Sequence, residues 1–149
     1  MVLPSDNESQ RLLGEKLKSR PDFQSLIMLI ESLLGDNGCP WDRERTLADC
    51  PKYLDGELRE VIEAVESGDD ANLEEELGDL LFMVAFTIKV AEKEGKLSQT
   101  GVFERILNKM VYRHPHVFGG EMEAETAGDV LDNWGKLKEQ EKAKKVDGD

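Results

Sequence analysis

The chain has 149 residues, a length typical of one domain, and its 32 acidic and 19 basic residues give a net charge of −13. A surface of that sign repels nucleic-acid backbones and anionic lipid, so we expect neither a nucleic-acid polymer nor a membrane as partner. A small phosphorylated ligand is compatible with this charge, because a bound divalent cation reverses the local sign.

Targeting signals are not apparent in the sequence. It lacks a run of about 18 apolar residues, which excludes a transmembrane helix. The first residues, MVLPSDNESQ, lack the apolar centre of a signal peptide, so we expect a cytoplasmic protein. Cys39 and Cys50 form no CxxC pattern, and in the cytoplasm we expect both to be free thiols.

Helical periodicity recurs along the chain, and no segment alternates with the period of a strand. The predicted helices cover about residues 21–34, 51–66, 72–94, 100–113 and 127–138. Thr46 with Asp49 and Thr126 with Asp129 have the spacing of helix caps. The sequence therefore predicts an all-α helical bundle over residues 21–142, preceded by a polar segment (1–20) and followed by a charged tail (143–149).

The predicted helix over residues 72–94 is apolar on more than one face. Phe82, Met83, Phe86 and Val90 lie beside its main apolar stripe. Such a helix is buried on more than one side. We expect the extra face to pack against the helix over 100–113 or against a second subunit, and we expect a homodimer.

Two acidic pairs give the clearest functional signal. Glu57 with Glu60 (ExxE) and Glu76 with Asp79 (ExxD) lie on the same flank of the apolar stripes of two consecutive helices. A short turn around Gly68 makes these helices antiparallel, and the two pairs are symmetric about that residue. We therefore predict that Glu57 faces Asp79, that Glu60 faces Glu76, and that all four carboxylates converge.

Converging carboxylates repel one another unless a cation is present. Oxygen ligands without His or Cys favour Mg²⁺ or Mn²⁺ over zinc. A di-iron bundle needs Glu-x-x-His pairs within its helices, and His114 and His116 lie beyond the predicted ones. A single ExxE pair is typical of a solvated helix face, but two pairs matched in flank and register favour a metal site.

Several sequence blocks, in this order, resemble the MazG family of all-α nucleoside triphosphate pyrophosphohydrolases, in its single-domain form. Besides ELRE (57–60) and ELGD (76–79), they are GCPWDRERT (38–46), EELGDLLF (75–82), RHPHVFGG (113–120) and NWGKLKEQEK (133–142). The resemblance covers about residues 24–142. It implies Mg²⁺-dependent hydrolysis of an NTP or dNTP to the monophosphate and pyrophosphate, in housekeeping of the nucleotide pool.

The resemblance also implies residue roles. Glu57, Glu60, Glu76 and Asp79 match the family's catalytic metal ligands. The implied substrate-binding residues are Lys109, Arg113, Trp134 and Lys138. These residues also have structural explanations. Lys109 and Arg113 are cations of the kind favoured near the carboxyl end of a helix, and Trp134 has the spacing of a core residue. Gly56 stands where the family usually has Glu, and Tyr53 and Asn72 stand where some active members have Lys.

The acidic cluster indicates metal-assisted hydrolysis, with Glu60 as a candidate proton acceptor from water. No GxxxxGK[ST] loop is present, which excludes a P-loop NTPase. Two alternatives stay open. One is a related pyrophosphohydrolase acting on another nucleotide, and the other is a non-catalytic helical dimer that binds a nucleotide or a protein.

Overall fold

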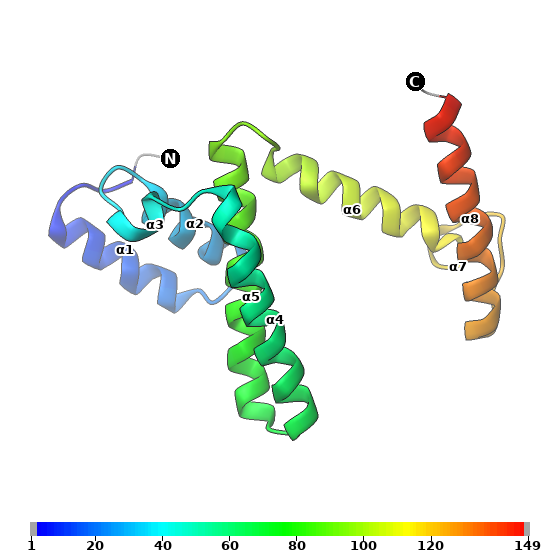
Figure 1. The fold of residues 1–149 in the computed structure, drawn as a ribbon, viewed down its shortest axis with the longest axis horizontal. Helices are drawn as coiled ribbons and strands as arrows, with labels where there is room; N and C mark the ends of the chain where they lie inside the picture. The colour runs from blue at the N-terminus through cyan, green and yellow to red at the C-terminus, as the bar shows by residue number, and fades with distance from the viewer. Residues whose placement is uncertain (1–2, 148–149) are drawn as a thin grey trace. The chain divides into compact units, whose positions relative to one another are not determined.

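The computed structural model describes residues 3–147, and its regular elements over that range are all helices. In chain order (Figure 1) they are α1 (Asn7–Ser19), α2 (Phe23–Leu34), α3 (Pro40–Arg43), the 3₁₀ helix η1 (Leu47–Asp49), α4 (Cys50–Ser67), α5 (Asp70–Lys93), α6 (Gln99–Arg113), α7 (Pro115–Phe118) and α8 (Ala127–Asp147). The predicted all-α class is confirmed. None of the helices within residues 3–147 is long and apolar enough to cross a membrane.

Two stretches are more helical than the sequence suggested. The predicted polar segment 1–20 contains α1, which begins where Asp6 Oδ1 accepts a hydrogen bond from the Ser9 amide at 2.9 Å. Ion pairs such as Arg11–Glu8, one turn apart, support it. The helix predicted over residues 127–138 is too short, because α8 continues to Asp147, through most of the predicted charged tail. Its Ala and Lys residues favour helix, and Lys144 and Lys145 lie favourably at its carboxyl end.

The chain divides into two compact units, one ending at Gln99 and the other beginning at Thr100. In the first, α4 and α5 form an antiparallel pair (Figure 1). The turn between them places Gly68 at φ +69°, a left-handed conformation that glycine adopts without strain. Asp69 then caps α5 by accepting a hydrogen bond from the Asn72 amide. This tight connection fixes the register between the two acidic pairs.

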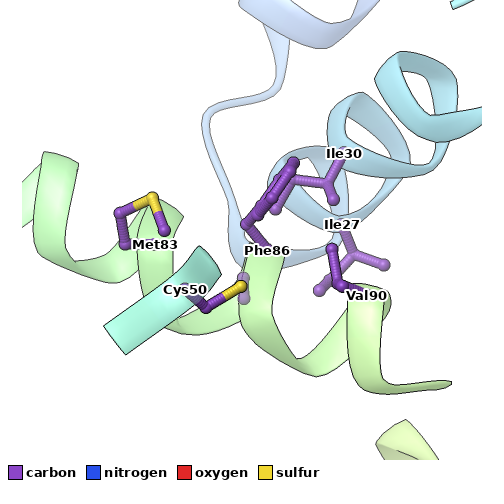
Figure 2. Packing of buried hydrophobic residues seen from close by; sticks show 7 residues of the cluster. Ile27, Ile30, Cys50, Met83, Phe86 and Val90 are labelled. Atoms are coloured by element: carbon purple, nitrogen blue, oxygen red, sulfur yellow. The ribbon is translucent and has the colours of Figure 1, made fainter. Parts of the chain in front are cut away.

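The core of the first unit lies where α2 packs against α5. Ile27 and Ile30 of α2 contact the cluster that contains Phe86 and Val90 of α5 (Figure 2). The extra apolar face of α5 is therefore covered by α2. This corrects the prediction, which assigned that face to the helix over 100–113 or to a second subunit. The error arose because the sequence does not show which helix packs against the apolar stripe of α2.

The loop before α4 is held by side-chain hydrogen bonds. Asp49 Oδ2 accepts from both the amide (2.9 Å) and the hydroxyl (3.0 Å) of Thr46, which confirms the predicted cap. Glu94 Oε1 also accepts from the Leu47 amide at 2.8 Å. These bonds anchor the segment that carries Trp41 and Arg45 near the start of α4.

In the second unit, α6 and α8 are joined by hydrogen bonds. The indole Nε1 of Trp134 donates to the Arg113 carbonyl at 2.8 Å, and the Tyr112 hydroxyl donates to Gln140 Oε1 at 2.9 Å. Leu137, on the same face of α8, is 5% exposed. The predicted Thr126–Asp129 cap is confirmed by hydrogen bonds in both directions.

Candidate metal site

Helices α4 and α5 bring the two acidic pairs together. A carboxylate oxygen from each of Glu57, Glu76 and Asp79 lies within 4.8 Å of the other two. Glu60 lies close enough to Glu57 and Glu76 to raise the pKa of both. The arrangement follows the symmetry about Gly68, because each pair occupies the same flank of its helix. The structure thus groups all four residues named from the sequence.

Two oxygens of this cluster lack a partner. Glu57 Oε2 and Glu76 Oε2 are buried and accept no hydrogen bond, and no Lys or Arg within residues 3–147 forms an ion pair with any of the four carboxylates. A buried carboxylate oxygen without a donor or cation is costly. An arrangement with several such oxygens is stabilised when a cation binds.

The pKa values of the cluster reflect this electrostatic conflict. Burial raises the pKa of Glu57 above its ordinary value, and the charges of Glu60 and Asp79 raise it further. Burial is also the largest cause of the raised pKa of Glu76, and the contact with Glu60 and the charge of Asp79 raise this pKa further. These oxygen-only donors fit a hard divalent cation. The residues present therefore suit a metal such as Mg²⁺.

A cavity of about 190 Å³ adjoins two of these carboxylates, Glu57 and Asp79. Its wall includes aromatic and basic side chains, namely Trp41, Arg45, Tyr53, Phe82 and Phe86. The Arg45 guanidinium lies 4.4 Å from the Trp41 ring centroid, and the Trp41 and Tyr53 rings meet edge to face at 5.8 Å. Trp41 thus organises its loop and also lines a cavity beside the acidic cluster.

Helical spacing contained a signal for part of this cavity. Tyr53 precedes Glu57 by four residues, and Phe82 follows Asp79 by three, so each aromatic shares a face with an acid. Trp41 and Arg45 gave no such signal, because their position depends on a loop that returns to α4.

The residues that the family resemblance assigned to substrate lie in the second unit. Lys109 and Lys138 are exposed. Arg113 forms a two-hydrogen-bond ion pair with Glu141 of α8. Trp134 is half-buried, with its indole nitrogen bonded to α6 and its ring edge-on to His114 at 5.4 Å. Trp134 therefore has a packing role, whatever else it does.

Comparisons with known proteins agree with this all-helical fold. Residues 45–118 match the MazG nucleotide pyrophosphohydrolase domain. A crystal structure of a mazG-related protein from Thermotoga maritima superposes with a TM-score of 0.69 at 28% identity, covering 78% of this chain and 98% of that one. The chain belongs to the MazG family.

Curated relatives are longer proteins. The chain is 41% identical over 111 residues to a nucleoside triphosphate pyrophosphohydrolase of Escherichia coli, which covers 74% of this chain and 42% of the relative. It is 37% identical over 123 residues to nucleoside triphosphate pyrophosphohydrolase/pyrophosphatase MazG of Thermotoga maritima, covering 83% of this chain and 46% of the relative. The chain spans less than half the length of these relatives.

Proposed function

We propose that this chain hydrolyses nucleoside triphosphates, ribo or deoxy, to the monophosphate and pyrophosphate, with Mg²⁺ as cofactor and Mn²⁺ as a substitute. The observation that carries the proposal is the cluster of Glu57, Glu60, Glu76 and Asp79, with buried carboxylate oxygens that lack partners. The names of the similar proteins support the same reaction.

Each acid has a role that follows from its surroundings. Glu57, Glu76 and Asp79 hold the cation, since one oxygen of each already lies within 4.8 Å of the others. A divalent cation bound there offsets phosphate charge and lowers the pKa of water. Glu60 is exposed and lies outside that group of three, so it accepts the proton of the attacking water.

The substrate's other groups need different surroundings. The aromatic wall formed by Trp41, Tyr53 and Phe82 suits the planar base, because stacking on an aromatic ring favours every base to a similar degree. Lys109 and Arg113 bind phosphate oxygens, and Trp134 and Lys138 assist them, as the family resemblance implies. Arg113 is suited to this role because its planar guanidinium pairs with two phosphate oxygens at once.

A second copy of the chain covers an apolar surface in this proposal. On the α4–α5 pair, large apolar side chains are 44–60% exposed, namely Leu58, Ile62, Val65, Leu77, Leu81 and Val84. Exposed apolar residues grouped in this way are typical of an interface. The active form is then a homodimer acting in the cytoplasm on the nucleotide pool. Light scattering at micromolar concentration tests this, and a monomer contradicts it.

The activity is tested by pyrophosphate release from the eight common NTPs and dNTPs with Mg²⁺. We expect the wild-type chain to release pyrophosphate and Glu60→Gln to lose nearly all release. Glu63→Gln, at an exposed position one turn further along α4, is the matched control and keeps the wild-type rate. Absence of release by the folded wild type contradicts this substrate class. Metal-dependent nucleotide binding without release indicates the non-catalytic dimer.

A further inference from the structure

The ion pair between Arg113 of α6 and Glu141 of α8 is more enclosed than most in the described part of the chain. Arg113 Nε donates to Glu141 Oε1 at 3.2 Å, and Nη2 donates to Oε2 at 2.7 Å. The two side chains are 19% and 27% exposed, against 60% and 67% for Arg11 and Glu8. A pair with two parallel hydrogen bonds fixes the plane of the guanidinium as well as its position.

This geometry leaves one edge of the guanidinium available. Arginine has five N–H donors, and Glu141 occupies those of Nε and one on Nη2. No other side chain or carbonyl within residues 3–147 accepts a hydrogen bond from this guanidinium. The Nη1–Nη2 edge can therefore pair with two oxygens of one phosphate group. The Trp134 indole also fixes the Arg113 backbone, by donating to its carbonyl.

The charges around the pair favour an anion. The hydrogen bonds from Arg113 lower the pKa of Glu141, and the charges of Lys109 and Lys145 lower it further. Glu141 is thus ionised at neutral pH and is outnumbered by three cations. Residues 100–149 contain 10 acidic and 8 basic side chains, against 22 and 11 in residues 1–99. The second unit carries little of the chain's negative charge.

We propose that Glu141 is a positioning residue, which holds the guanidinium of Arg113 side-on so that its free edge binds the substrate's phosphates. The inference rests on the proposed function, in which Arg113 binds phosphate. Replacing Glu141 by Gln keeps one acceptor but removes the charge and the second strong hydrogen bond. The guanidinium then samples other orientations, and binding of phosphate weakens.

Two readouts test this on the 149-residue chain. The first is binding of inorganic tripolyphosphate with Mg²⁺, measured by titration calorimetry. We expect Glu141→Gln to weaken it about tenfold, a free-energy change of about 1.4 kcal/mol. The second is hydrolysis, where we expect KM to rise by a similar factor with little change in kcat, because the phosphate contact is made in the bound substrate too. Glu139→Gln, exposed on α8, is the matched control and behaves as wild type.

A double-variant cycle separates positioning from a general effect on folding. In an Arg113→Ala background, Glu141→Gln should cause no further loss of tripolyphosphate affinity, because there is no guanidinium to orient. A further tenfold loss in that background overturns the proposal. If Glu141→Gln fails to fold, Glu141→Asp keeps the charge on a shorter side chain and should show the same loss in smaller measure.

Other outcomes are equally decisive. Wild-type affinity in Glu141→Gln overturns the positioning role, and the proposed function stands if hydrolysis persists. Tighter binding in Glu141→Gln also overturns it and shows that Glu141 competes with phosphate. A wild-type chain that binds tripolyphosphate but hydrolyses no nucleotide contradicts the proposed function. In that case the calorimetry of Glu141→Gln still tests whether Glu141 positions Arg113. Absence of tripolyphosphate binding by the wild type overturns the positioning role.

Discussion

The carboxylate cluster predicts that Glu76→Gln changes stability in opposite directions with and without Mg²⁺. Without metal, Glu76 Oε2 is buried and unpartnered, and Glu60 and Asp79 repel its charge. A neutral amide removes that repulsion, so the variant should melt above the wild type in EDTA. With Mg²⁺ at 100 times its Kd, the wild type should gain about 2.7 kcal/mol, or about 5–11 °C in Tm, and the variant much less.

Differential scanning fluorimetry in EDTA and in a Mg²⁺ series measures both effects on one plate. Glu74→Gln is the matched control, because Glu74 is exposed on the same helix and outside the cluster. Its melting temperature should follow that of the wild type in each buffer. A Glu76→Gln protein that melts below the wild type in EDTA, or a wild type that Mg²⁺ does not shift, would refute the electrostatic reasoning.

Three further predictions concern stability. In the folded state the pKa values of Glu57 and Glu76 lie above the ordinary value of 4.5, so the folded metal-free protein binds more protons than the unfolded chain. The free energy of unfolding of the metal-free protein therefore falls as pH rises through these raised values. In EDTA, the advantage of Glu76→Gln in Tm should therefore grow from pH 4.5 to 7, and an advantage independent of pH contradicts this. Ile30→Ala should cost about 2–5 kcal/mol in urea unfolding, because Ile30 is 0% exposed, whereas Leu12→Ala at a 53% exposed site should cost far less. Gly56→Ala should raise the free energy of unfolding by up to about 1 kcal/mol, since nothing lies within 4 Å of an added Cβ, and a loss of stability would show a hidden clash.

The acidic site was predictable because its geometry is local. A two-helix hairpin with a short turn has few degrees of freedom, so sequence positions symmetric about Gly68 determine which side chains meet. Glu57, Glu60, Glu76 and Asp79 are all within that hairpin. Their convergence depended only on helical periodicity and on the antiparallel arrangement, both of which can be read from the sequence.

Other parts of the structure depend on contacts that spacing does not show. The extra apolar face of α5 is covered by α2. Several helices have apolar stripes of similar character, so the stripes alone do not show which helix covers this face. Arg45 and Trp41 reach the cavity because Asp49 and Glu94 anchor their loop, and Glu94 lies 47 residues from its partner Leu47. The pairing of Arg113 with Glu141 likewise joins residues 28 apart. Each of these is a tertiary contact that helical periodicity does not predict.

At Gly56, next to Glu57 of the acidic cluster, the chain differs from the usual family pattern. A side chain fits there, since nothing in the described structure lies within 4 Å of an added Cβ, so packing does not require glycine. The family usually has Glu at this position, next to Glu57. A fifth carboxylate would add repulsion to a cluster in which two buried oxygens already lack partners. Glycine avoids that repulsion at a cost in helix stability of about 1 kcal/mol relative to Ala. The metal-free protein therefore has four acids rather than five to accommodate, and in the proposed function three of them, Glu57, Glu76 and Asp79, hold the cation.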